Sequence, residues 1–342
     1  MKLKIIIQSI VFIGASIFSF TSYGLQLNVV NRIVIFGDSL SDMGYMNNSP
    51  AGFLPEGKAP TYTTPGGHVW AYYLAKTLGH PESTNNSTLF GEGDDYVKKT
   101  DQSVGRDWAA GGATTNVNVT VIAQHFIAPS VERQVDHFLD SVGHHPDPEM
   151  LYIIWAGVNN ISYATRTLDP EKIVAAAQEA IDDNLKMVKK LYNDGARHIL
   201  VIGMPDIGQT PLVIKATLGN KSLAEIVSAV ALWYNDQLSQ GLDTLEDADG
   251  KKIPVMFYNP FDMMDNIIKT VKEKGSYTLD NLMINDVTDE ACKGDFYGSL
   301  KCLNHVPDSE HYMFADAIHP SDVTHQIIAK ELEKYLETAK DN

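Results

Sequence analysis

Cysteine and positive charge are both scarce in this sequence. Only two of its 342 residues are cysteines, and its 27 Lys and Arg residues stand against 43 Asp and Glu residues, which gives a formal net charge of −16. A phosphate backbone would repel such a chain, and no basic cluster offsets this, so we expect no nucleic acid partner. With 44% hydrophobic and 20% charged residues, the composition excludes a disordered, collagen-like or coiled-coil chain and supports a sizeable buried core.

The sequence also lacks an apolar run long enough to span a membrane, which takes about 20 residues. Its start has a shorter pattern: Lys2 and Lys4, an apolar stretch at 10–20, and then Ser22 and Gly24 at the −3 and −1 positions of a cleavage site. A charged start, a short apolar run and a small-x-small site are typical of a secretory signal peptide. We therefore expect an exported bacterial protein that is secreted, either in transit through the periplasm or outside the cell.

Export changes the interpretation of the two cysteines, because an exported chain meets an oxidising compartment. Nine residues lie between Cys292 and Cys302, and two glycines among them allow the loop to turn. This favours a disulfide between them over two free thiols. A metal site is the weaker alternative, since no second cysteine pair accompanies them.

Short apolar segments alternate with longer amphipathic ones after residue 24. Four segments rich in Ile, Val or aromatic residues are predicted to be buried parallel strands, at 33–36, 151–156, 198–203 and 254–258. Helical periodicity is found, among other places, at 70–78, 170–192, 223–245 and 323–336. The alternation indicates one α/β domain at 25–342, following a signal peptide at 1–24, with a parallel sheet covered by helices on both faces. Its chemistry should lie on loops at the carboxyl ends of the strands.

Two segments look irregular, at 47–67 and 279–316, and the second contains both cysteines. Loops longer than about 15 residues are uncommon in compact domains unless they are functional. Both are therefore predicted to contact substrate. The stretch 292–302 has two interpretations: a disulfide-stapled lid that an activating protease could cut, or a loop that the bridge simply stabilises.

Ser39 follows the first predicted strand and is preceded by Gly37, which would hold its hydroxyl outward as a nucleophile. A helix N-cap is an equally ordinary use of a serine at such a junction. A serine nucleophile also needs a base. Asp316 lies three residues before His319 and can orient its imidazole while the other ring nitrogen faces the serine. Spacing alone leaves open a surface Asp beside a helix-capping His, since the chain has 11 histidines.

An ester hydrolase needs hydrogen-bond donors for the oxyanion that forms in the reaction. Gly112 lies in a Gly-Gly turn and offers a backbone N–H that no side chain obstructs. Asn159 follows the second predicted strand and offers a side-chain amide. Each feature is unremarkable when taken separately.

Taken together, four blocks in the same order and spacing resemble the GDSL lipases/esterases, or SGNH hydrolases, over nearly the whole predicted mature chain. The blocks are Gly37-Asp38-Ser39-Leu40, Gly112, Gly157-x-Asn159 and Asp316-x-x-His319. The resemblance implies a flavodoxin-like three-layer α/β/α fold with a central parallel sheet. It also implies Ser39 as nucleophile, His319 as general base and acid, Asp316 as its orienting residue, and an oxyanion hole of Ser39, Gly112 and Asn159. It implies no metal and no organic cofactor.

The long first block at 36–44 is similar to the lipolytic branch of that family, which includes lysophospholipases and glycerophospholipid:cholesterol acyltransferases. The expected substrate is thus a lysophospholipid at a membrane or micelle surface, with possible transfer of the acyl group to a sterol. Asn160 and Tyr45 depart from the family pattern, which usually has Asp and Asn at those positions. The alternatives are a carbohydrate O-acetyl esterase of the same family and a non-catalytic exported binding protein.

Overall fold

The fold is that of a computed structural model, which describes residues 32–45, 61–80, 107–121, 126–167, 169–217, 221–292 and 309–339. The predicted signal peptide, Cys302, and most of the predicted substrate-contacting loop at 47–67 lie outside the described residues. None of the helices within the described ranges is both long and apolar enough to cross a membrane.

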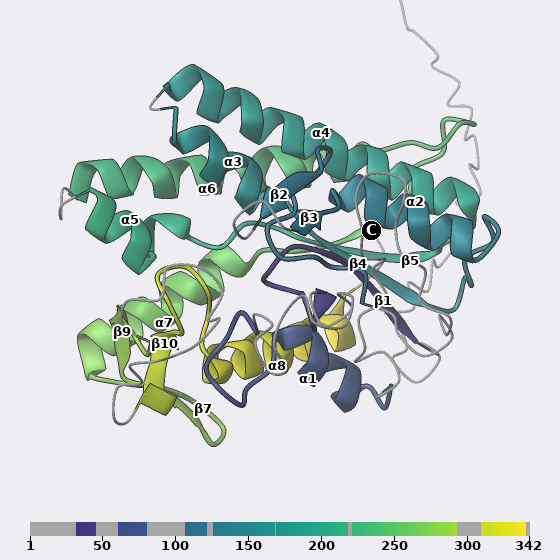
Figure 1. The fold of residues 1–342 in the computed structure, drawn as a ribbon. Helices are drawn as coiled ribbons and strands as arrows, with labels where there is room; N and C mark the ends of the chain where they lie inside the picture. Colours follow the sequence, from purple (N-terminus) through teal and green to yellow (C-terminus); the bar gives the residue numbers. More distant parts are fainter. Residues whose placement is uncertain are drawn as a thin grey trace, which may run out of the picture.

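A parallel sheet of four strands forms the centre of the molecule (Figure 1). The strand order is β1-β4-β5-β6, and the strands are Ile33–Gly37, Leu151–Trp155, His198–Ile202 and Met256–Tyr258. Each of the four was predicted from its apolar run, and the observed ends differ by no more than two residues. Both β1 and β4 are buried along their whole length, because helices cover both faces of the sheet.

The outer edge of β1 is covered by a fifth segment that begins at Asp107. Asp107 forms an isolated parallel bridge with Ile35, and the Trp108 and Ala110 N–H groups donate to the carbonyls of Ile35 and Gly37 at 2.8 and 3.1 Å. This segment takes the place of the second strand in the flavodoxin-like order 2-1-3-4-5. The chain therefore reverses its direction of winding beside β1, which is where ligands bind in such sheets.

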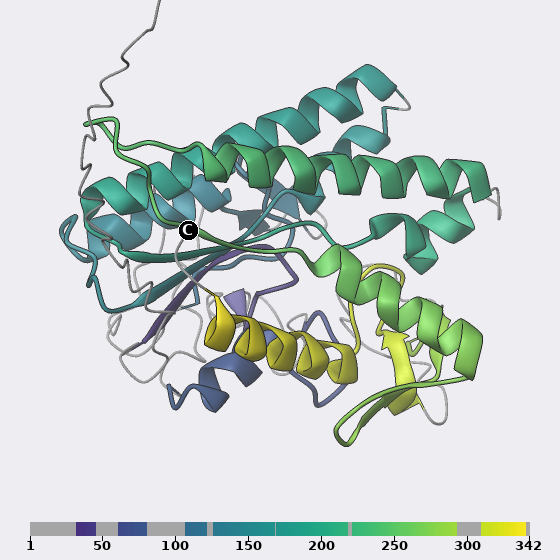
Figure 2. The ribbon, with the colours of Figure 1, turned by 180° about the vertical axis from the view of Figure 1, so that it is seen from behind.

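Alternate residues of each strand point to opposite layers. Val34, Phe36 and Ile154 belong to one core cluster, while Ile33 and Ile35 belong to another. The first cluster packs under α2 (Val131–Ser141), α4 (Pro170–Asp194) and α6 (Lys221–Asp243), and the second under α1 (Trp70–Thr77) and α8 (Asp322–Thr338). Figures 1 and 2 show these two groups of helices on opposite faces of the sheet. The predicted three-layer α/β/α architecture is confirmed.

Short connecting elements surround the carboxyl end of the sheet. They are the antiparallel pair β2 (Val119–Val121) and β3 (Phe126–Ala128), the helices α3 (Val158–Thr165) and α5 (Pro211–Ala216), and the 3-10 helix η3 (Ile207–Gln209). Among them, α3 and α5 carry residues that contact the loops described below.

The prediction that 279–316 is irregular is partly wrong. The region includes β7 (Tyr277–Leu279), β8 (Leu282–Ile284), β9 (Asp286–Glu290), η4 (Ser309–His311) and β10 (Tyr312–Phe314). With α7 (Pro260–Lys274) these strands form a third core cluster beside α8 (Figure 1). They escaped prediction because each is only three to five residues long, and the β9 sequence DVTDE has no apolar run. Residues 293–308 lie outside the described residues.

Candidate active site

Ser39 lies in a tight turn directly after β1. The turn is closed by the Ser41 and Asp42 N–H groups, which both donate to the Asp38 carbonyl at 3.0 Å. No helix begins in the described turn, so Ser39 is not a helix N-cap. The strand end is itself fixed by Gln134 of α2, whose side chain accepts from the Gly37 N–H and donates to its carbonyl, both at 2.9 Å. The serine is therefore held by the sheet and by a neighbouring helix.

His319 and Asp316 lie on the loop between β10 and α8, and the structure brings them to Ser39. The His319 Nε2 is 2.9 Å from the Ser39 Oγ, and its Nδ1 is 2.7 Å from an Asp316 carboxylate oxygen. The exposed fractions of the three side chains are 9% for Ser39, 4% for His319 and 0% for Asp316. The side chains thus form one buried chain of hydrogen bonds over 280 residues of sequence.

The Asp316 carboxylate is held in its charged form. Burial acts to raise the pKa of Asp316, but the imidazole of His319 and several hydrogen bonds outweigh it, and the net pKa lies below the ordinary value. The second carboxylate oxygen accepts the N–H groups of Ile318 and His319 at 2.9 and 2.7 Å. An ionised Asp316 accepts from Nδ1–H and so leaves Nε2 of His319 free to receive the serine proton.

Gly112 and Asn159 are linked to the serine turn through their neighbours: the Gly111 N–H donates to Asp42, and the Asn159 amide contacts Asp38. Gly112 has a φ of 88°, which favours glycine, and Tyr163 donates to its carbonyl at 3.2 Å. Within the described ranges, the N–H groups of Ser39 and Gly112 donate to no residue. The Asn159 amide donates to the Ala113 carbonyl at 2.9 Å and has only a long contact of 3.4 Å with Asp38. Two backbone donors are thus available for a ligand, and the Asn159 amide could reach a ligand only by giving up its long bond to Asp38.

Two buried carboxylates hold this arrangement together, and sequence reasoning did not single them out. Asp42 accepts the N–H groups of Gly44, Tyr45 and Gly111 at 2.7, 2.6 and 2.8 Å, so it ties the serine turn to the Gly-Gly turn. Asp38 accepts the Leu40 N–H at 3.0 Å. Burial raises the pKa of each carboxyl from 3.8 to about 6. The position of Asp42 in the first sequence block could have drawn attention to it, but only the fold shows which N–H groups it accepts from.

Asn160, one of the two departures from the family pattern, links the second and third blocks. Its side chain donates to the Thr115 hydroxyl at 2.8 Å and accepts the Thr115 N–H at 3.0 Å. That hydroxyl in turn donates to Asp183 of α4 at 2.6 Å. The Thr115 hydroxyl has a single proton, which it donates to Asp183. An Asp at position 160 would compete for that proton, whereas the Asn160 amide donates to the hydroxyl instead. Tyr45, the other departure, is fully buried, and its hydroxyl donates to the Ile127 carbonyl.

Cys292 lies just after β9 and is fully buried, with its N–H donating to the Ala315 carbonyl at 2.8 Å. It therefore adjoins the loop that carries Asp316. Since Cys302 lies outside the described residues, the disulfide and the lid at 292–302 stay predictions. Among the residues that the structure describes, no group of three or more His, Cys, Asp and Glu could hold a metal ion.

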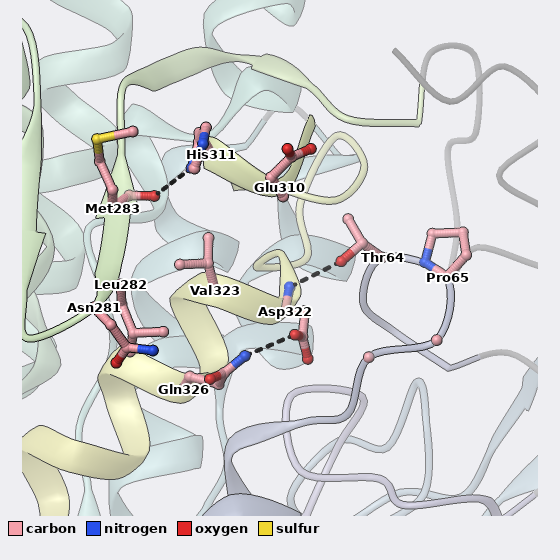
Figure 3. Close-up of a pocket in the computed structure, with 12 residues that line it drawn as sticks. Thr64, Pro65, Asn281, Leu282, Met283, Glu310, His311, Asp322, Val323 and Gln326 are labelled. Carbon is pink, nitrogen blue, oxygen red and sulfur yellow. Dashed lines mark hydrogen bonds between the residues drawn. The ribbon is translucent and has the colours of Figure 1, made fainter. Parts of the chain in front are cut away.

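A separate cavity of about 400 Å³ lies at the start of α8 (Figure 3). Its lining includes Thr64, Asp322 and Gln326 and none of the triad or oxyanion-hole residues. The Asp322 N–H donates to the Thr64 hydroxyl at 3.1 Å, and its carboxylate accepts from Gln326 at 2.8 Å and from the His68 N–H at 2.9 Å. These bonds attach the segment 64–68 to α8 on one wall of the cavity.

The fold and the site define an α/β protein with a buried Ser–His–Asp arrangement, in which the N–H groups of Ser39 and Gly112 have no partner among the described residues. The chain belongs to the GDSL-like lipase/acylhydrolase family, whose model matches residues 33–332. Members of this family are carboxylic ester hydrolases or acyltransferases, and this chain is accordingly one of these.

Relatives are similar at low identity over much of the chain. A GDSL esterase/lipase of Arabidopsis thaliana is 26% identical, over 89% of this chain and 87% of its own length. An acetylesterase of Thermothelomyces thermophilus is 26% identical over 64% of this chain and 67% of its own length. A phosphatidylcholine-sterol acyltransferase of Aeromonas hydrophila is 27% identical over 61% of this chain and 53% of its own length.

Proposed function

We propose that this protein is an exported serine ester hydrolase that cleaves the acyl ester of lysophospholipids. The observation that carries the chemistry is the buried chain of hydrogen bonds from Ser39 through His319 to Asp316, at 2.9 and 2.7 Å. A serine hydroxyl becomes a useful nucleophile when a base within hydrogen-bond reach is itself oriented by a third group. The same arrangement argues against the alternative of a non-catalytic binding protein.

In the proposed mechanism, the Ser39 oxygen attacks the acyl carbonyl while His319 takes its proton. The N–H groups of Ser39 and Gly112 and the amide of Asn159 stabilise the oxyanion of the tetrahedral intermediate. The intermediate then expels the alcohol, which leaves with the proton from His319. Water resolves the acyl-serine ester with His319 again as base, and a sterol hydroxyl could take the place of water. Hydrolysis and acyl transfer thus share one site and differ only in the acceptor.

The lipid substrate is supported by the sequence of the segment 47–69, which contains aromatic and apolar side chains such as Phe53 and Leu54 that suit an acyl chain. The Aeromonas relative, whose name specifies a phosphatidylcholine-sterol acyltransferase, supports the same substrate class and the sterol acceptor. Export, through the signal peptide at 1–24, places the enzyme where it meets such lipids at a membrane or micelle surface.

A carbohydrate O-acetyl esterase is the second candidate, and the acetylesterase of Thermothelomyces thermophilus is the observation that favours it. The proposed chemistry is the same for both candidates, so they differ in what binds beside it. An acetyl ester needs room for two carbons, whereas a lysophospholipid needs an apolar cleft for a long chain.

Product analysis separates the candidates. The purified protein would be incubated with lysophosphatidylcholine, phosphatidylcholine and acetylxylan, with and without cholesterol, and the products resolved by thin-layer chromatography. We expect free fatty acid from lysophosphatidylcholine, and cholesteryl ester when cholesterol is present. Acetate from acetylxylan with no fatty acid from either lipid would instead establish the carbohydrate esterase. Ser39→Ala serves as the blank for all three substrates.

A further inference from the structure

Tyr62 has a backbone conformation that a tyrosine seldom adopts. Its φ is 53°, in the left-handed region that favours glycine. A bulky residue stays in that region only where its surroundings fix it, and such residues cluster at functional sites. Tyr62 is also 94% buried, because its exposed fraction is 6%. Neither the strand and helix pattern nor the four sequence blocks drew attention to it.

The backbone of Tyr62 is held by the same helix that follows the catalytic histidine. His325 of α8 is fully buried, and burial lowers its pKa to about 3, so the ring is neutral at any pH at which the protein would work. Its Nδ1 accepts the Trp70 N–H at 3.1 Å, and the ring proton must therefore be on Nε2. That Nε2 faces the Tyr62 carbonyl at 3.4 Å. The segment just after Tyr62 is fixed to the same helix by the bond between Asp322 and Thr64 (Figure 3) and by the bond from the His68 N–H to Asp322.

The ring of Tyr62 lies between His319 and the Gly-Gly turn at 111–112. On one side its centroid is 5.2 Å from that of the His319 imidazole, with the planes tilted by 50°. On the other side the phenol lies against Gly111, where an added Cβ would be only 1.8 Å from the Tyr62 oxygen and 2.2 Å from its Cζ. The Gly111 N–H donates to Asp42 at 2.8 Å. Gly111 is therefore clamped between a carboxylate and the phenol, one residue before Gly112.

We infer that Tyr62 is a positioning residue, whose ring sets the spacing between His319 and the oxyanion turn at 111–112. The inference rests on the proposed ester hydrolysis. Misplacing a reacting group by about 1 Å can cost 10²-fold in rate. Oxyanion donors act mainly in the transition state, so their displacement lowers kcat more than it raises KM. The ring carries the role, since within the described ranges the Tyr62 hydroxyl makes no hydrogen bond.

The test compares Tyr62→Gly, which suits the positive φ, with Tyr62→Phe, which keeps the ring. We expect Tyr62→Gly to lower kcat by about 10- to 100-fold, with KM within about threefold of wild type. Tyr62→Phe should keep kcat within about threefold of wild type. The matched control is Tyr258→Ala, because Tyr258 is similarly buried, with 9% exposed, but lies at the end of β6, the strand farthest from β1. It should lose stability and keep its kcat.

Gly111→Ala provides a second route if Tyr62→Gly does not fold. Its Cβ would displace the ring, so we expect at least a tenfold loss of kcat. In the double variant Tyr62→Gly/Gly111→Ala, the loss should be smaller than the product of the two single losses, because the clash is gone. Unchanged kcat in Tyr62→Gly or in Gly111→Ala, or a rise in KM alone, would overturn the inference while leaving the hydrolase intact. A wild-type protein that cleaves no ester would overturn the proposed function and this inference with it.

Discussion

The serine turn at 38–42 and the acid–base loop at 316–319 meet at one site but are built in different ways. The serine turn continues a fully buried strand of the central sheet, is closed by bonds to the Asp38 carbonyl, and is held from outside by Gln134. The acid–base loop lies outside that sheet and follows β10, whose described pairing is with β9 in a two-stranded sheet. It is held by bonds from distant segments, such as the Leu212 N–H of α5 to the Ala317 carbonyl at 2.8 Å.

The two regions should therefore respond differently to mutation: the serine turn is supported by the central sheet, and the acid–base loop by contacts between the sheet domain and a peripheral subdomain. The serine turn is supported by the core of the domain, so loss of the side chains that hold it, such as Gln134 and Asp42, should also lower stability. The acid–base loop depends on the contacts of a peripheral subdomain made of α7 and β7 to β10. Changes there should affect the rate while the central sheet stays folded.

The largest expected effect tests whether the two regions act as one unit. Ser39→Ala and His319→Ala should each abolish ester hydrolysis, since loss of nucleophile or base costs several orders of magnitude in rate. Asp316→Asn should also be damaging, because it weakens control of the His319 tautomer. Steady-state kinetics measure the effect, and circular dichroism checks the fold.

The matched control for the nucleophile is Ser41→Ala, two residues away. The Ser41 hydroxyl is buried and bonds to no residue in the described ranges, so its removal should leave folding and activity nearly unchanged. Activity of Ser39→Ala within tenfold of wild type would refute the assignment of the nucleophile.

Asn159→Ala is expected to have the next largest effect and sharpens the comparison on the oxyanion side. Its kcat should fall by about 10²–10³ while KM changes little, because an oxyanion donor acts mainly in the transition state. A large rise in KM at unchanged kcat would show instead that Asn159 binds the substrate in its ground state.

The pH dependence of stability should distinguish the serine turn from the acid–base loop by sign. Asp38 has a pKa raised to about 6, so the stability it contributes is fully present below about pH 3.8 and is lost as pH rises through about 6. Asp316 has a lowered pKa, and its contribution is present above about pH 3.8 and is lost as pH falls.

Denaturant unfolding at pH 4.5 and pH 7.5 measures this difference. From pH 4.5 to pH 7.5, Asp38→Asn should lose less stability than wild type, by up to about 2 kcal/mol. In Asp316→Asn, the stability should change between these pH values as it does in wild type, because the lowered pKa of Asp316 lies below this range. An identical pH dependence in wild type and Asp38→Asn would contradict the burial of a protonated Asp38.

The smallest expected effect concerns the docking of the peripheral subdomain. Lys215 of α5 is 2.6 Å from Glu290 of β9, next to the bond that α5 makes to the acid–base loop. Lys215→Ala should lower the free energy of unfolding by about 1 kcal/mol or less and reduce kcat by no more than about threefold. Lys186→Ala, which breaks the Lys186–Glu132 pair between α4 and α2, is the control and should leave kcat unchanged. An equal loss of kcat in both variants would show that the peripheral docking has no specific role.

Much of the fold followed from local patterns, because the central strands are buried on both faces and their apolar runs are unambiguous. The three-layer arrangement then followed from the alternation of strands and helices. The strands β7 to β10 could not be predicted, since they are short and partly polar and are stabilised by packing on α7 and α8. Ser39, Gly112, Asn159, Asp316 and His319 were predicted from the motif blocks, and the fold joins Ser39, His319 and Asp316 by hydrogen bonds.

What the sequence by itself determined was the identity of the residues that can do chemistry, because nucleophile, base and donor each require a particular side chain or a glycine. What only the tertiary structure decided was how those residues are held. Asp42 accepts from Gly111 of the Gly-Gly turn, His325 contacts the Tyr62 carbonyl, and Asn160 and Asp183 share the Thr115 hydroxyl. These contacts join segments far apart in the chain, and no local pattern encodes a partner that only the packing of three layers brings within hydrogen-bond distance.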